Sequence, residues 1–216
     1  MRIGVLGTGA VGQTIATKLV EIGHEVRMGS RSTSSEAASA WSAGLGEAAS
    51  AGTFADAAHF GELAFNCTAG AGALQAVGAA ADALEGKLLI DVSNPLEFGG
   101  DPPSLFVAIT DSLGEQIQRA LPATSVVKAL NTMNADVMVD PAIVPGEHVA
   151  FVCGDDPDAK AKTAALLNAF GWPTERVIDC GDITGARATE SYLLLWLRMM
   201  SSVGGAHFNI AVHRGG

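Results

Sequence analysis

The chain has 216 residues, of which 48% are hydrophobic and 17% are charged, and its formal net charge is −10. This length fits one compact domain, or one domain with a small appendage, and excludes a large second domain. The acidic balance argues against a nucleic-acid partner, because binding a polyphosphate requires clustered Lys and Arg side chains.

The longest stretch without a charge, residues 63–81, is rich in Gly and Ala and is interrupted by Asn66, Thr68 and Gln75. We interpret it as strand, loop and helix and expect no membrane span. A strand that begins at residue 2 leaves no room for a signal peptide, so a cytoplasmic location is expected.

Short β-branched or apolar runs alternate with segments of helical length along most of the chain. This alternation predicts an α/β fold with a doubly wound, mostly parallel sheet. The predicted strands are Arg2–Leu6, Glu25–Met28, Leu63–Cys67, Lys87–Asp91, Ser125–Ala129, His148–Cys153 and Arg176–Asp179.

The first helix is predicted from an apolar stripe that runs from Val11 through Ile15 and Leu19 to Ile22, and Gly23 is its expected C-terminal stop. Residues 32–58 are rich in Ser, Ala and Gly. They predict one or two short helices with an exposed polar face.

The pattern changes at Asp182, which divides the chain into a main domain over residues 1–181 and a small C-terminal helical segment over residues 182–216. Within this segment, Glu190–Met200 is strongly apolar, and we expect it to pack across the sheet or against a second subunit. The cysteines have no CxxC spacing and are predicted to be reduced, buried thiols without metal or catalytic chemistry. They are Cys67, Cys153 and Cys180.

The turn after the first strand carries the spacing GxGxxG. In a Rossmann fold the first glycine permits the tight turn, the second lets the backbone approach a pyrophosphate, and the third allows the helix to pack close to the strand. Alone this motif is weak evidence, but its place between a strand and an amphipathic helix favours dinucleotide binding by residues 1–181. The residues of the turn are Gly7, Thr8, Gly9, Ala10, Val11 and Gly12.

The end of the second strand favours NADP over NAD. NAD-binding chains place Asp or Glu here to hold the ribose hydroxyls, whereas this chain reads Gly29-Ser30-Arg31-Ser32. A carboxylate would repel the 2′-phosphate of NADP, and Arg31 beside the Ser30 hydroxyl supplies donors instead. The alternative is a solvated Ser/Arg turn.

Ligands of open parallel sheets bind beyond the carboxyl ends of the strands. Three more loops are therefore candidates, and Asn94-Pro95 has a plain turn as its alternative. Neither a nucleophile elbow nor a metal-ligand pair at helical spacing is present in the sequence, so we predict no metal site. The candidate loop residues are Thr68, Ala69 and Gly70, then Asn94, and finally Asn131, Thr132 and Asn134.

Five segments spread over nearly the whole chain resemble the coenzyme F420-dependent NADP oxidoreductase family. They are GSRS after the second strand, IDVSNPL at 90–96, VVKALNTMNADVMVDP at 126–141, FVCGDDPDAK at 151–160 and GDITGARATESYLLLWLRMM at 181–200. The resemblance implies NADP(H) as cofactor and coenzyme F420 as co-substrate. It also implies direct hydride transfer between the deazaflavin C5 and the nicotinamide C4, without a side chain acting as acid or base.

The resemblance further implies that the Thr68 loop lies near the nicotinamide half of NADP and the loop 131–134 near the deazaflavin. It implies a small-molecule redox partner and a homodimer formed through the C-terminal helix. Arg187 and Arg198 have two open interpretations. They could meet acidic groups of a deazaflavin tail, or they could be structural, with Arg198 paired to Glu190. The isolated His207 has no predicted role.

The chain departs from the family pattern in two places. Thr33–Ser35 lacks a further basic residue, and Thr68–Gly72 carries only small side chains, which predicts a wider mouth to the pocket. Two other functions therefore stay open: an NADPH-dependent reductase of a flavin, a ferric chelate or an imine, and a non-catalytic NADPH-binding sensor.

Overall fold

The computed structural model describes residues 1–100 and 102–215. The strands of the main sheet are β1 Arg2–Leu6, β2 Glu25–Ser30, β3 Ala49–Thr53, β4 Leu63–Asn66, β5 Leu88–Asp91, β8 Ser125–Ala129, β9 Ala150–Cys153 and β10 Val177–Asp179, and a separate hairpin pairs β6 Leu96–Glu97 with β7 Ser104–Leu105. The helices are α1 Ala10–Glu21, α2 Glu36–Ala43, α3 Phe54–Phe60, α4 Gly70–Gly78, α5 Ala81–Leu84, α6 Leu113–Ala120, α7 Ala135–Val139, α8 Pro157–Phe170 and α9 Ala186–Val203.

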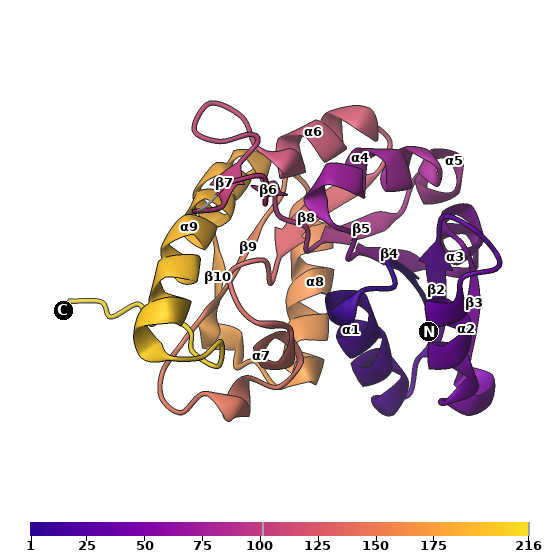
Figure 1. Ribbon diagram of the computed structural model, residues 1–216, viewed down its shortest axis with the longest axis horizontal. Helices are drawn as coiled ribbons and strands as arrows, with labels where there is room; N and C mark the ends of the chain where they lie inside the picture. The colour runs from indigo at the N-terminus through magenta and orange to yellow at the C-terminus, as the bar shows by residue number, and fades with distance from the viewer. Residues whose placement is uncertain (101, 216) are drawn as a thin grey trace.

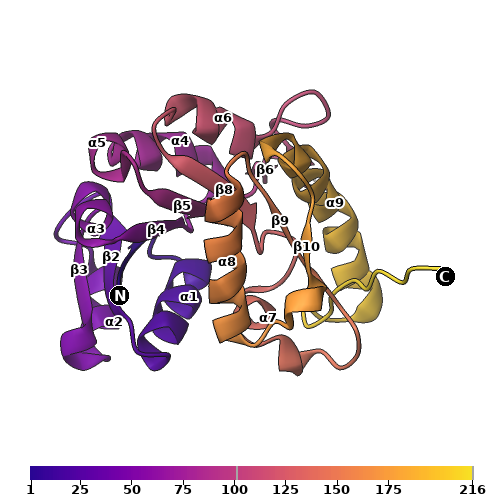
Figure 2. The same ribbon diagram turned by 180° about the vertical axis from the view of Figure 1, so that it is seen from behind.

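The main sheet has eight strands in the order β10-β9-β8-β5-β4-β1-β2-β3, with helices on both faces (Figures 1 and 2). All neighbours from β8 to β3 are parallel, whereas β9 is antiparallel to β8 and parallel to β10. The predicted doubly wound, mostly parallel sheet is therefore confirmed. The chain leaves β1 toward β2 on one side and later adds β4 on the other, and such a switch point opens a crevice at the carboxyl ends.

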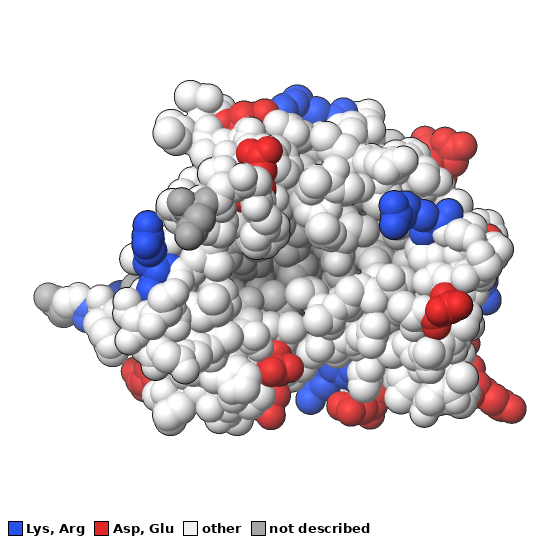
Figure 3. All heavy atoms as spheres, viewed as in Figure 1, with Lys and Arg blue, Asp and Glu red and all other residues white. Residues whose placement is uncertain are grey.

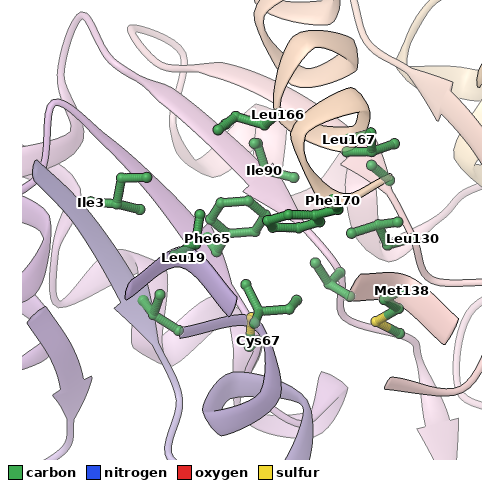
Figure 4. Packing of buried hydrophobic residues seen from close by; sticks show 14 of the residues in the cluster. Ile3, Leu19, Phe65, Cys67, Ile90, Leu130, Met138, Leu166, Leu167 and Phe170 are labelled. Atoms are coloured by element: carbon green, nitrogen blue, oxygen red, sulfur yellow. The ribbon is translucent and has the colours of Figure 1, made fainter. Parts of the chain in front are cut away.

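Two hydrophobic cores lie on opposite faces of the sheet, because successive strand side chains alternate in direction. Val5 and Phe65 belong to the core under α1, α7 and α8, whereas Leu6 and Ala64 belong to the core under α3, α4 and α6. Figure 4 shows how residues from the sheet and from α8 meet in the first of these cores. The predicted stripe of α1 packs there too, and Gly23 follows the helix with a φ of +90°.

The prediction for residues 32–58 was incomplete. Both short helices are present as α2 and α3, but the edge strand β3 lies between them and pairs in parallel with β2. Its sequence, ASAGT, lacks the β-branched alternation that marks a strand. Helix α3 also packs more closely against the sheet than expected. A Cβ at Gly4 would lie 2.4 Å from the Ala57 carbonyl oxygen, so the backbone of α3 almost touches the backbone of β1.

The C-terminal segment is joined tightly to the sheet. The expected pair of Glu190 with Arg198 is wrong, because Glu190 is buried and binds Lys128 Nζ at 2.7 Å and the backbone N–H groups of Leu113 and Gly114 at 2.8 and 2.9 Å. Helical periodicity could suggest only partners on α9 itself, whereas the true partners come from β8 and α6.

For other residues the structure supports some of the expectations and corrects the rest. Arg187 binds Glu115, with Nε to Oε2 at 2.8 Å. His207 is not isolated, since its Nε2 lies 3.0 Å from Asp136 Oδ2. Cys67 and Cys153 are buried as predicted, but Cys180 is exposed, because it lies just past the end of β10. Among the described residues, no helix is both long enough and apolar enough to span a membrane.

Candidate functional site

Three adjoining cavities form one groove across the carboxyl ends of β1, β2, β4 and β5. The first, of about 270 Å³, is lined by Ser30 and Arg31; the middle, of about 400 Å³, shares Arg31 and Phe54 with it. The last, also of about 270 Å³, shares Thr68 and Ala69 with the middle cavity and continues to Asn94 and Phe98. Figure 3 shows this face hollowed near its middle, with mostly uncharged surface around the hollow.

The glycine turn between β1 and α1 has the geometry that the motif predicts. Gly7 has a φ of +120°, and a Cβ at Gly12 would lie 2.3 Å from the Gly7 carbonyl oxygen, so neither position tolerates a side chain without movement. A Cβ at Gly9, in contrast, would meet no atom within 4 Å. Gly9 therefore leaves open a space in the groove that a side chain would fill.

Two helices begin at the groove without a side-chain cap. The N-cap residues of α1 and α4 are Gly9 and Ala69, which line the same middle cavity, and neither helix has an acidic residue in its first turn. Free N–H groups and the positive ends of the helix dipoles thus face one space, an arrangement that binds anions. Helices α5 and α9 also begin without a side-chain cap, whereas side chains cap the other five described helices: Ser35 for α2, Thr53 for α3, Ser112 for α6, Asn134 for α7 and Asp156 for α8.

The end of the groove beside β2 carries the Ser-Arg pair. Ser30 is nearly buried and its hydroxyl donates to the Ser32 carbonyl, so it holds the turn. Arg31 is exposed, and no hydrogen bond or ion pair engages its guanidinium within residues 1–100 and 102–215. Phe54, which the sequence did not suggest, supplies an apolar wall beside Arg31. Among the described residues, this cavity has a guanidinium without a partner and no Asp or Glu in its lining, which suits a phosphorylated ribose.

The other end of the groove is held by close contacts between two loops. A Cβ at Gly70 would lie 2.0 Å from the Asn94 carbonyl oxygen, so the start of α4 lies directly against the loop after β5. Asn94 and Asn131 are joined by two hydrogen bonds, Nδ2 of Asn94 to the Asn131 carbonyl at 2.8 Å and Nδ2 of Asn131 to Oδ1 of Asn94 at 3.0 Å. The structure thus brings the candidate loops after β4, β5 and β8 together.

The loop after β8 is strained and buried. Leu130 has a φ of +62°, a left-handed conformation that costs a non-glycine residue about 1–2 kcal/mol. Thr132 is only 1% exposed, and its hydroxyl has no hydrogen-bond partner in the described part of the chain. Asn134 caps α7, with Oδ1 accepting from the Asp136 N–H at 2.9 Å. Backbone strain and an unpaired buried hydroxyl are features that cluster at functional sites.

A buried ionic cluster lies behind the groove, and the sequence analysis did not detect it. Lys128 Nζ is 2.7 Å from Asp91 Oδ2 and 2.7 Å from Glu190 Oε1, with the lysine side chain fully buried. Burial alone lowers a lysine pKa, but the two carboxylates raise the pKa of Lys128 above its ordinary value. The available signal was a lysine inside the apolar strand sequence SVVKA.

Comparison with known proteins supports one family. The profile of the family described as NADP oxidoreductase, coenzyme F420-dependent, matches residues 2–95. A solved structure from Arthrobacter sp. FB24, named as a candidate F420-dependent NADP-reductase, is 46% identical, has a TM-score of 0.92, and is matched over 98% of this chain and 99% of its own.

Two curated relatives are more distant. The F420-dependent NADP reductase of Methanothermobacter marburgensis is 29% identical over 92% of each chain. The metalloreductase STEAP3 of Rattus norvegicus is 29% identical over 88% of this chain, which spans only 36% of that protein's length. With the groove geometry, these matches show that the chain belongs to the coenzyme F420-dependent NADP oxidoreductase family, whose members use NADP(H) and F420, and is an NADP-dependent oxidoreductase.

Proposed function

We propose that the chain binds NADP(H) along the groove and exchanges hydride directly with coenzyme F420. The observation that carries this proposal is the pair of uncapped helix starts, at Gly9 and Ala69, in one cavity that also contains Arg31, which has no partner among the described residues. One cationic side chain and two positive helix ends complement a pyrophosphate and a 2′-phosphate.

Each part of the groove has its own task in this proposal. Arg31 binds the 2′-phosphate, and the free N–H groups at the start of α1 bind the pyrophosphate. Gly9 lets the phosphate approach the helix, since no side chain fills that space. Thr68, Ala69, Gly70 and Asn94 surround the last cavity, where the nicotinamide half would lie.

In this proposal, coenzyme F420 lies at the loop after β8. The buried side-chain atoms without partners in the described residues are Thr132 Oγ1, Tyr192 Oη and Trp196 Nε1. Thr132 belongs to this loop, and Tyr192 and Trp196 belong to α9, so both segments keep hydrogen-bonding capacity that the described residues do not use. Asn131 and Asn134 then act by holding the loop in place, because their observed bonds go to Asn94 and to the start of α7.

The reaction needs no acid or base from the protein. The two cofactors supply the reactive ring carbons, and the protein contributes their orientation, which can be worth about 7–11 kcal/mol of the barrier when the reacting atoms are held near contact. Apolar side chains in the wall of the last cavity can shield the rings from water; the larger ones are Val11, Val92, Leu96 and Phe98.

Absorbance spectroscopy tests the proposal. Purified protein is mixed with NADP⁺ and reduced F420, and the visible band of oxidised F420 is followed while NADPH forms. Recovery of that band in step with NADPH supports the proposal. Consumption of NADPH with a flavin, a ferric chelate or an imine, and not with F420, would contradict it. The ferric arm matters because the rat relative is named a metalloreductase.

The division of the chain at residue 182 and the homodimer remain proposals. Helix α9 keeps Leu194, Leu195 and Val203 between 41% and 59% exposed, which favours a second copy of the chain against this helix. Light scattering of the wild type and of Leu195→Glu provides the test. A dimer that the substitution converts to a monomer is the expected result, and a wild-type monomer would contradict it.

A further inference from the structure

A chain of buried hydrogen bonds beneath the groove ends at Thr68. It starts at Lys128, whose Nζ donates to Asp91 Oδ2 at 2.7 Å, to the Ser93 carbonyl oxygen at 2.6 Å and to Glu190 Oε1 at 2.7 Å. An ammonium group has three N–H donors and no acceptor. All three donors are therefore used, and Asp91 acts as an acceptor at this end.

The next link fixes the orientation of the Asn66 amide. Asn66 Nδ2 lies 2.8 Å from Asp91 Oδ1, in a fully buried setting. The reverse orientation would place two oxygen acceptors at that distance with no hydrogen between them, so chemistry assigns the nitrogen to this side. The amide oxygen of Asn66 must then face Thr68.

The last link fixes the polarity of the Thr68 hydroxyl. Thr68 Oγ1 lies 2.7 Å from Asn66 Oδ1, which can only accept, so the hydroxyl proton points to Asn66. The oxygen of Thr68 keeps its lone pairs for the groove, and Thr68 lines both the middle and the last cavity. Because Asn66, Asp91 and Lys128 are at most 1% exposed, water has no access to the Asn66 amide and cannot reverse its orientation.

We propose that Thr68 is a specificity-determining residue whose hydroxyl oxygen accepts a hydrogen bond from the amide N–H of the pyridine nucleotide, with Asn66, Asp91 and Lys128 as positioning residues that set its polarity. This inference rests on the proposed binding of NADP(H). It assigns a chemical preference to the groove: a ligand group that donates a hydrogen bond next to Thr68 is favoured, and one that only accepts or is apolar is disfavoured.

Calorimetric titration with NADP⁺ and with its 3-acetylpyridine analogue tests the preference, since the analogue carries a methyl group in place of the amide nitrogen. The wild type should bind NADP⁺ about 3- to 10-fold more tightly than the analogue, the effect of one net hydrogen bond. Thr68→Ser keeps the acceptor and should keep this ratio. Thr68→Val removes the acceptor and should bring the ratio to about 1.

Two further variants separate polarity from packing. Thr110→Val makes the same change at an exposed threonine outside the three cavities of the groove, and it should leave the ratio unchanged. Asn66→Leu frees the Thr68 hydroxyl to rotate and to donate, so the ratio should fall toward 1. Binding of 2′,5′-ADP, which lacks the pyridine half, shows whether each variant is folded; if Asn66→Leu does not fold, the comparison of Thr68→Val with Thr68→Ser decides the matter.

The outcomes distinguish this inference from the function on which it rests. A wild-type ratio near 1, or a Thr68→Val variant that keeps the wild-type ratio, overturns the role of Thr68 even if F420 is turned over. The expected ratios without hydride exchange to F420 support the role of Thr68 and contradict the proposed co-substrate. A wild type that binds no NADP⁺ overturns both.

Discussion

Two glycines of the turn between β1 and α1 should respond differently to substitution by alanine: Gly9 mainly through NADPH affinity, and Gly12 through the stability of the fold. Gly9 has a φ of −76° and a ψ of −180°, which alanine adopts freely, and its Cβ would meet nothing within 4 Å. Gly9→Ala should therefore change the free energy of unfolding by no more than about 1 kcal/mol. Its methyl group would, however, occupy the space at the start of α1. Losing one or two charge-assisted hydrogen bonds there, at about 1.5–3 kcal/mol each, should weaken NADPH at least about 10-fold.

Gly12→Ala should lower the free energy of unfolding, which Gly9→Ala leaves almost unchanged. Its Cβ would lie 2.3 Å from the Gly7 carbonyl oxygen, well inside the 3.0 Å below which such contacts are essentially never found. Helix α1 must move, at a cost of about 1–3 kcal/mol, and the melting temperature should fall by about 2–4 °C per kcal/mol in a domain of this size.

Thermal melts and NADPH titrations of these variants and of Gly78→Ala test both predictions. Gly78 lies at the end of α4 with open space at its Cβ, so its substitution is the matched control. Full NADPH affinity in Gly9→Ala, or an unchanged melting temperature in Gly12→Ala, would refute the reasoning.

Three more predictions concern single side chains. Arg31→Ala should weaken NADPH about 10- to 100-fold and NADH by about 2-fold or less, because only NADPH carries the phosphate that Arg31 binds; equal losses in titration would contradict the cofactor assignment. The hydrogen bonds from Arg119 lower the pKa of Asp111 from 3.8 to about 2, so this carboxylate stabilises the fold above pH 3.8 and loses that effect as the pH falls toward 2. In urea unfolding, the free energy of unfolding of Asp111→Asn should accordingly fall less steeply with pH over this range than that of the wild type. The same pH dependence in both proteins would show that the Asp111–Arg119 pair does not stabilise the fold. A thiol reagent should label Cys180 alone in native protein, because burial raises the pKa of Cys153 to about 12 and raises that of Cys67 as well; rapid labelling of a second thiol, seen by mass spectrometry, would argue against this packing.

The sequence was informative wherever a local pattern determines the structure. Strand-forming runs and the glycine turn depend on residues close together in the chain, so β1, α1 and β2 could be placed correctly. Strand β3 escaped detection because its small residues carry no strand signal and its conformation depends on pairing with β2. The candidate loops could be brought to one edge by topology alone, since parallel strands end on the same side.

Ion pairs and hydrogen bonds between side chains far apart in the sequence could not be predicted from local patterns. Glu190 pairs with Lys128 from β8, and no spacing rule relates two residues so far apart. Likewise, the polarity of Thr68 depends on Asn66 and Asp91, whose side-chain directions emerge only when β4 and β5 are paired. A charged residue inside an apolar strand remains the one sequence signal for such a cluster, because a buried charge requires a partner.

Direct hydride exchange requires that the nicotinamide and deazaflavin rings meet in this groove, with no third group carrying the hydride between them. NADPH carrying deuterium at the transferred C4 position, incubated with oxidised F420 and the protein in ordinary water, tests it most directly. Direct hydride transfer predicts that mass spectrometry finds the deuterium in reduced F420. Reduced F420 containing only solvent hydrogen, or no reduced F420 at all, would contradict it.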